Sequence, residues 1–133
     1  MSPATICSRE RSTFLIAWDD ERPVGHAHLA WNGTKLDLPE IQDVYVAEDA
    51  RRRGIATALT YAAEAEAVAR GYRRLSLSVG IGNLAAQALY ARLGFEDAAL
   101  EPERVVGTIM LRGEPFEVDD TLVYLVKRLS GGA

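Results

Sequence analysis

The stretch IQDVYVAEDARRRGIATAL, residues 41–59, decides the fold because a strand signal, a basic turn and a helix signal follow one another in it. IQDVYV is rich in β-branched and aromatic residues, which predicts a strand over 41–46. A short acidic loop and three consecutive arginines then lead to Gly54. The alanine-rich segment that follows predicts a helix over 55–70.

The predicted helix has one face that is suited to packing on a sheet. Ile55, Leu59, Ala62 or Ala63, and Val68 recur at helical spacing, so we expect these residues to be buried. Gly71 follows the helix directly and is well placed to end it.

The junction between this strand and this helix has the chemistry of an anion site. A helix start leaves backbone N–H groups unpaired and carries the positive end of the helix dipole. Gly54 lets a ligand approach the main chain, and the small side chain of Ala56 keeps that approach open. Arg51, Arg52 and Arg53 add fork-shaped donors for phosphate oxygens. The sequence therefore predicts a diphosphate site here, with a solvated basic turn as the alternative interpretation.

The remaining segments predict a mixed α+β (or mixed α/β) protein with a single domain over 1–133. A central sheet, mostly antiparallel, is flanked by helices, and its parallel crossover joins the strands at 41–46 and 75–79. Asn83 can cap the second helix, and Gly94 can end it in a left-handed turn. The other predicted elements are strands over 13–18 and 24–31 that form a hairpin, a helix over 84–93, a strand-like arm over 104–112 and a last strand over 121–129.

Composition restricts the partners that the protein can have. The 133 residues carry a formal net charge of −4, which argues against nucleic-acid or anionic-membrane binding by the chain as a whole. The sequence lacks an apolar run of the roughly 18 residues that a membrane span needs, and its start lacks a signal-peptide pattern, so we expect a cytoplasmic protein. Cys7 is the only cysteine, which excludes an internal disulfide. His26 and His28 have no third ligand in the pattern, so we expect no metal site.

Two motifs together resemble the GNAT superfamily of N-acetyltransferases. Residues 51–56 read Arg-x-x-Gly-x-Ala, and NLAAQALYARLGFE, residues 83–96, is similar to the second block of that family. The resemblance extends over roughly residues 13–129 and implies that acetyl-CoA is the co-substrate. It implies that the backbone amides of the loop hold the diphosphate, a role that falls on Arg51, Arg52, Arg53, Gly54, Ile55, Ala56 and Thr57.

The same resemblance assigns the reactive end of the co-substrate. Val44, Tyr45 and Val46 match the strand whose backbone pairs with the pantetheine arm, and Asn83 matches a residue that contacts it. Tyr90 matches the tyrosine near the thioester sulfur, where it can act as general acid. Asn83 as a helix cap and Tyr90 as a packing residue are the alternative interpretations.

The attacking amine must lose a proton, so a base is needed. Glu40, at the start of the central strand, is the first candidate, since family members often use a glutamate there. Asp43 ranks second, because strand alternation points it to the other face, and His26 and His28 rank third. An ordinary surface carboxylate is the alternative interpretation of Glu40.

The sequence departs from the family at both ends. The residues before Thr13 leave room for one short strand, so we expect the usual N-terminal helix pair to be missing. The acceptor side would then be more open or be completed by a partner subunit, or the chain is an N-terminally shortened form. Residues 96–120 are long for a simple link, and we expect them to form an arm that supports a homodimer or borders the acceptor pocket. Acidic residues on this arm would favour a cationic amine.

The resulting prediction is an N-acetyltransferase that moves an acetyl group to a primary amine by direct attack in a ternary complex. A catalytically degenerate module that binds acyl-CoA and serves regulation is the alternative. A phosphate-binding protein of another class is the third possibility. The identity of the acceptor, a small molecule or a peptide, stays open.

Overall fold

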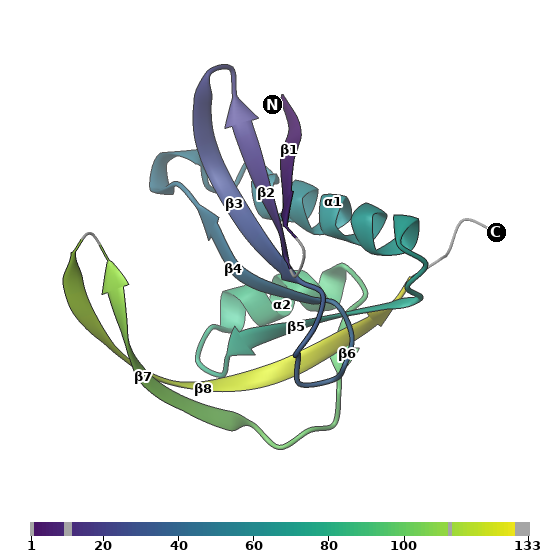
Figure 1. Ribbon diagram of the computed structural model, residues 1–133, viewed down its shortest axis with the longest axis vertical. Helices are drawn as coiled ribbons and strands as arrows, with labels where there is room; N and C mark the ends of the chain where they lie inside the picture. The colour runs from purple at the N-terminus through teal and green to yellow at the C-terminus, as the bar shows by residue number, and fades with distance from the viewer. Residues whose placement is uncertain (1, 10–11, 112, 130–133) are drawn as a thin grey trace. The chain divides into compact units, whose positions relative to one another are not determined.

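Antiparallel strands build the first part of the sheet (Figure 1). The computed structural model describes residues 2–9, 12–111 and 113–129. The chain divides into two compact units. The first holds the residues up to Leu77 together with those from Lys127 onward, and the second is Ser78–Val126. A single domain therefore stays a prediction.

The first unit holds the predicted hairpin and the parallel crossover. Strand order is β1-β2-β3-β4-β5, in which β1 to β4 pair antiparallel and β4 pairs parallel with β5. This confirms the expected topology, and β1 is the strand expected before Thr13. The elements are β1 (Ser2–Arg9), β2 (Ser12–Asp19), β3 (Arg22–Ala30), β4 (Glu40–Val46), a 3₁₀ turn (Glu48–Ala50), α1 (Ile55–Ala69) and β5 (Arg74–Gly80).

Helix α1 packs closely on one face of β1 to β4. Gly25 on β3 permits this approach, because a Cβ there would lie 2.9 Å from the Ile55 Cγ2 and 3.0 Å from the Tyr45 carbonyl oxygen. Ala27 and Leu29 continue the same buried face of β3. The helix is thus held against β3 at the turn that carries the arginines.

The buried stripe of α1 differs in part from the prediction. Ile55, Leu59 and Ala63 are buried as expected, but Ala67 is fully buried and Val68 is only half-buried. The observed stripe repeats every four residues, and its two alanines let the second half of the helix lie close to the sheet. The prediction for Val68 is wrong because apolar periodicity favours the larger side chain. The contact between α1 and the sheet instead takes the small side chain of Ala67.

A polar and aromatic cluster fastens the C-terminal end of α1. The Trp31 Nε1 donates to the Thr13 hydroxyl at 2.9 Å. The Arg70 guanidinium lies 3.9 Å from the centre of the Trp31 ring, and Tyr72 stacks on the same ring at 5.7 Å. Gly71 has φ 87 and ends the helix as predicted.

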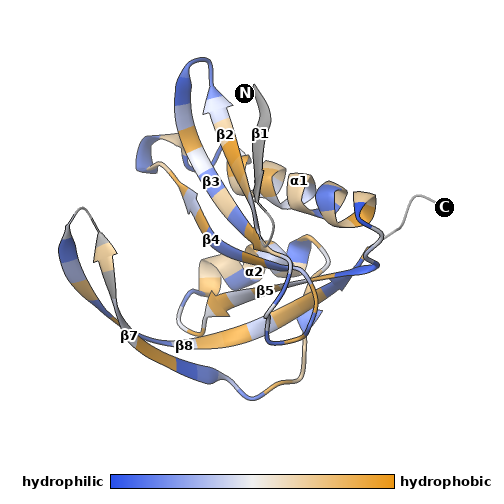
Figure 2. Cartoon of the chain, viewed as in Figure 1, coloured by the Kyte–Doolittle hydropathy of each residue, from blue (hydrophilic) through white to orange (hydrophobic). Residues whose placement is uncertain are grey.

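The second unit carries helix α2 and a long hairpin. The predicted arm is a strand that pairs antiparallel with β8, and β8 begins at Glu114 instead of residue 121. Figure 2 shows both hydrophilic and hydrophobic segments along β7 and β8. The acidic residues between 114 and 120 had indicated a loop. Pairing with β7 makes this segment part of β8. The elements are α2 (Leu84–Arg92), β6 (Glu96–Asp97), β7 (Glu103–Leu111) and β8 (Glu114–Arg128), whose last residues belong to the first unit.

These elements confirm the mixed α+β class, with a mostly antiparallel open sheet and two α-helices in the described chain. No described helix is both long and apolar enough to cross a membrane.

The close approach at Gly25 gives a stability prediction. Gly25→Ala should lower the free energy of unfolding by about 1–3 kcal/mol, because the new methyl group meets a branched side chain and a backbone carbonyl. Urea denaturation followed by circular dichroism measures the change. Gly107→Ala on β7 is the matched control, since a Cβ there meets nothing within 4 Å. Equal stability of the two variants would contradict this packing.

Candidate functional site

The turn before α1 presents backbone donors to solvent. Arg52 has φ 66 and Gly54 has φ 76, so both lie in the left-handed region, and a Cβ on Gly54 would meet nothing within 4 Å. The first helical bond runs from the Ala58 amide to the Gly54 carbonyl at 3.0 Å. In the part of the chain that the structure describes, the amides of Arg53–Thr57 donate to no backbone carbonyl. Successive free amides at a helix start form a concave site for an anion.

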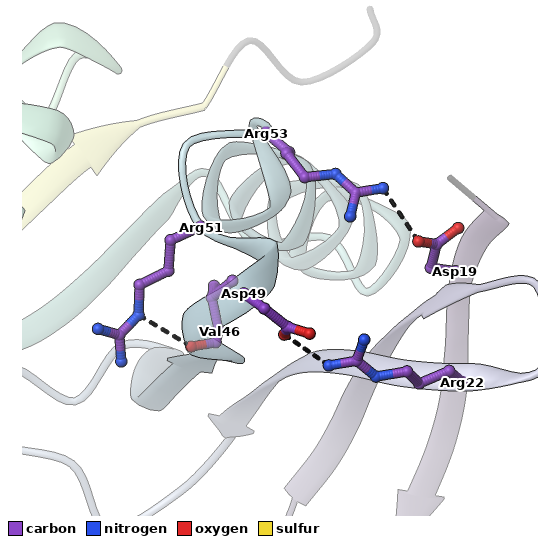
Figure 3. A network of polar contacts seen from close by, with 6 residues as sticks. All are labelled: Asp19, Arg22, Val46, Asp49, Arg51 and Arg53. Atoms are coloured by element: carbon purple, nitrogen blue, oxygen red, sulfur yellow. Dashed lines mark hydrogen bonds and ion pairs between the residues drawn. The ribbon is translucent and has the colours of Figure 1, made fainter.

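The three arginines of the turn make different contacts. The Arg51 Nε donates to the Val46 carbonyl at 3.1 Å, and Arg53 forms an ion pair with Asp19 on β2 at 3.0 Å (Figure 3). Arg52 is exposed and has no hydrogen bond or ion pair among the described residues. Two arginines therefore anchor the turn to β4 and β2, and Arg52 is the one that is free to meet a ligand.

A second ion pair ties the same loop to the sheet. Arg22 at the start of β3 donates to the Asp49 carboxylate at 2.5 Å. This bond lowers the pKa of Asp49 and raises that of Arg22. Because both groups are fully exposed, the pair contributes to loop position more than to stability.

Strand β4 is irregular where the sequence placed the pantetheine arm. Its register with β5 pairs Glu40 with Ser76 and Ile41 with Leu77 and ends there. On the β3 side, Asp43 and Val44 both lie opposite Ala27, and Asp43 has φ 51. This is a β-bulge, and it interrupts the alternation of side chains.

The bulge decides which side chains share the face opposite α1. Gln42 lies opposite His28, and Tyr45 lies opposite His26, on which its ring stacks at 5.6 Å. Glu40, Gln42 and Tyr45 therefore point to the same side as the two histidines. Strict alternation would have put Val44 there instead.

Glu40 is the buried carboxylate of this face. The residue is 5% exposed, and its Oε2 accepts a 2.7 Å hydrogen bond from the Gln42 Nε2. Its Oε1 is buried and has no protein partner among the described residues. Asp43 is exposed in the bulge. Of the carboxylates considered as a base, only Glu40 is buried with an acceptor atom to spare.

The histidines of β3 differ in exposure. His28 stacks flat on Phe14, with the ring centres 4.6 Å apart and the planes at 13°, and its Nε2 is buried without a partner in the described chain. His26 is exposed. Among the described residues no group of three or more His, Cys, Asp or Glu side chains is arranged to hold a metal ion.

In the second unit, Asn83 directly precedes α2 and Tyr90 lies near the end of this helix. The Asn83 Oδ1 accepts from the Ala86 amide at 3.1 Å, which confirms the predicted cap and leaves the side-chain amide group as a donor. Gly94 has φ 98, and the Phe95 amide donates to the Tyr90 carbonyl at 2.9 Å. The helix end therefore closes on Tyr90 as predicted.

Tyr90 is 6% exposed and packs edge-on against Phe95 at 5.8 Å. Burial raises the pKa of its phenol above the usual 10. The phenol is accordingly protonated at neutral pH, as a general acid must be. No hydrogen bond to its hydroxyl occurs within the described residues.

Sequence reasoning missed Gln42 and Asp19 in the first unit and Gln87 in the second. The spacing of two residues between Gln42 and Glu40 could have indicated a shared face. Asp19 and Gln87 escaped because their partners are distant in sequence or are backbone atoms. The Gln87 Nε2 donates to the Gly80 and Ile81 carbonyls at 2.9 Å each, which fixes the turn before Asn83.

The chain belongs to the Acetyltransferase (GNAT) family, whose model matches residues 2–95. An uncharacterized N-acetyltransferase of Methanocaldococcus jannaschii is 36% identical over 96 residues. That match covers 69% of this chain and 42% of the relative, so the chain spans less than half of that protein's length.

Solved structures share the fold. The ribosomal-protein-alanine N-acetyltransferase from Brucella melitensis is 28% identical with a TM-score of 0.65, over 89% of this chain and 69% of that one. A GNAT family acetyltransferase from Elizabethkingia anophelis with acetyl-CoA bound is 20% identical with a TM-score of 0.69, over 90% of this chain and 77% of that one.

The buried phenol gives a prediction for titration. Because the pKa of Tyr90 is raised, the stability that its neutral form contributes is fully present below pH about 10 and is lost as pH rises through the raised value. The difference between the 295 nm absorbance titrations of wild type and Tyr90→Phe isolates this residue among the five tyrosines. We expect a midpoint above 10, and a midpoint at or below 10 would contradict the burial of the phenol.

Proposed function

We propose that the protein is an acetyl-CoA-dependent N-acetyltransferase that acts on a primary amine by direct attack. Membership of the family supports the class of reaction. The observation that carries the proposal is the row of amides from Arg53 to Thr57 beside Arg52, all of which lack a hydrogen-bond partner among the described residues. Such a turn suits the diphosphate of acetyl-CoA, since amides and one mobile guanidinium can each meet phosphate oxygens.

Further groups are proposed for the rest of the co-substrate. We propose that the backbone of Val44, Tyr45 and Val46 pairs with the amides of the pantetheine arm, because the β5 register ends before these residues. Arg51 and Arg53 would hold the loop in shape, and the side-chain amide of Asn83 would donate to the arm. Gly54 would keep space for the phosphates.

The reaction then needs one base and one acid. The amine nitrogen attacks the thioester carbonyl carbon, the C–S bond breaks, and the products are an amide and free CoA. In the proposed mechanism Glu40 accepts the proton of the acceptor's ammonium, directly or through water, and Tyr90 donates a proton to the leaving thiolate. A backbone N–H near Val46 would stabilise the developing oxyanion.

The acceptor is a primary amine of a small molecule or of a peptide. The name of the Brucella relative makes a peptide that begins with alanine the first member of an assay panel. The homodimer and the cytoplasmic location predicted from the sequence are likewise proposals, and the long β7–β8 hairpin is the segment on which a second copy would pack.

Binding tests the first half of the proposal. By titration calorimetry acetyl-CoA should bind, whereas acetyl-pantetheine, which lacks the diphosphate, should bind at least about tenfold more weakly. Arg52→Gln should weaken acetyl-CoA by about three- to tenfold, because it removes one charge-assisted contact from an exposed site. Arg74→Gln, at the exposed start of β5, is the matched control. Equal affinity for acetyl-CoA and acetyl-pantetheine would contradict the diphosphate site.

Turnover tests the second half. Thiol release over a panel of amines and peptides should detect the reaction, and Tyr90→Phe should lower kcat by about a hundredfold with little change in acetyl-CoA affinity. An unchanged kcat would remove Tyr90 from the mechanism. Acetyl-CoA binding without turnover on any acceptor would instead favour the regulatory module.

A further inference from the structure

The carboxylate of Glu40 has two inequivalent oxygens. Its Oε2 accepts a short hydrogen bond from the Gln42 Nε2, at 2.7 Å, whereas its Oε1 is buried and lacks a partner in the described chain. A buried charged oxygen without a donor costs free energy, and such atoms are rare in folded proteins. This arrangement is stabilised once a donor reaches Oε1.

Gln42 is held in a fixed place by the strands around it. It lies opposite His28 on β3, and the bulge at Asp43 and Val44 begins directly after it. The His28 ring is in turn stacked on Phe14. The side-chain amide of Gln42 is therefore set on a regular, well-paired stretch of the sheet, immediately before the strand becomes irregular.

The chemistry of the amide fixes its orientation as well. A carboxylate offers only acceptors, so the NH₂ group of Gln42 must face Glu40 and its oxygen must face away. A neutral donor holds the carboxylate without neutralising it. Lysine or arginine at this position would compete with an incoming ammonium for the negative charge.

We propose that Gln42 is a positioning residue for the acceptor amine: by occupying Oε2 it turns Oε1 of Glu40 toward the incoming ammonium, from which Oε1 takes the proton. This inference rests on the proposed function, because it names the part of Glu40 that meets the acceptor. Gln42 itself touches neither co-substrate and exchanges no proton.

A double-mutant cycle tests whether Gln42 acts through Glu40. Gln42→Met keeps the length of the side chain and removes the donor, and it should lower kcat about tenfold, which is the worth of one hydrogen bond to a charged group. The KM for acetyl-CoA should not change. In a Glu40→Gln background, Gln42→Met should have no further effect on kcat. Independent effects of the two substitutions would overturn the proposal.

The split between kcat and KM separates positioning from general damage to the fold. Gln42→Met should lower kcat and leave the KM for acetyl-CoA unchanged. A structural defect would change both constants and would overturn the proposal. Asp37→Asn, an exposed carboxylate-to-amide change in the loop before β4, is the control for Glu40→Gln.

A double-mutant cycle on the free energy of unfolding, measured without substrate, distinguishes failure of the positioning role of Gln42 from failure of the proposed function. The same four proteins should show non-additive free energies of unfolding, since the bond between Gln42 and Glu40 exists in the free protein. Gln42→Leu repeats the cycle should Gln42→Met fail to fold. Additivity overturns the positioning role even in an active enzyme. Coupling in stability with no acetyl-CoA binding overturns the proposed function, and with it the positioning role.

Discussion

The close contact between α1 and β3 at Gly25 is the constraint on which the rest of the first unit depends. Without a side chain at Gly25, Ile55 and Leu59 reach the strand, and the first turn of the helix is brought beside the end of β4. The cluster around Trp31 secures the other end of the helix. The helix start is thereby held against the sheet, and the anion site proposed at its amides depends on this position.

Ion pairs around the turn serve position more than stability. Arg22 with Asp49 and Arg53 with Asp19 are exposed pairs, which are worth little in free energy. They flank a loop in which Arg52 and Gly54 have left-handed backbones. A basic run that looks uniform in sequence thus holds two arginines that anchor the turn and, as far as the described residues show, one arginine without a polar partner.

Local signals in the sequence predicted most of the fold. The cap at Asn83 and the left-handed end at Gly94 were predictable because each depends on residues a few positions away. The order of strands and helices followed from periodicity. Three features were not predictable, because each depends on a partner strand or on how the helix is rotated against the sheet. They are the burial of Ala67 in place of Val68, the bulge at Asp43 and the length of β8. The same reason hid the separate roles of Arg51, Arg52 and Arg53, since their partners lie elsewhere in the chain.

A crystal structure of the protein with CoA tests the central claim most directly. The account predicts that the diphosphate oxygens lie about 2.7–3.2 Å from the amide nitrogens of the turn at Arg53–Thr57. It further predicts that the Arg52 guanidinium lies against the same phosphates. Diphosphate density elsewhere on the molecule, with these amides still facing solvent, would contradict it.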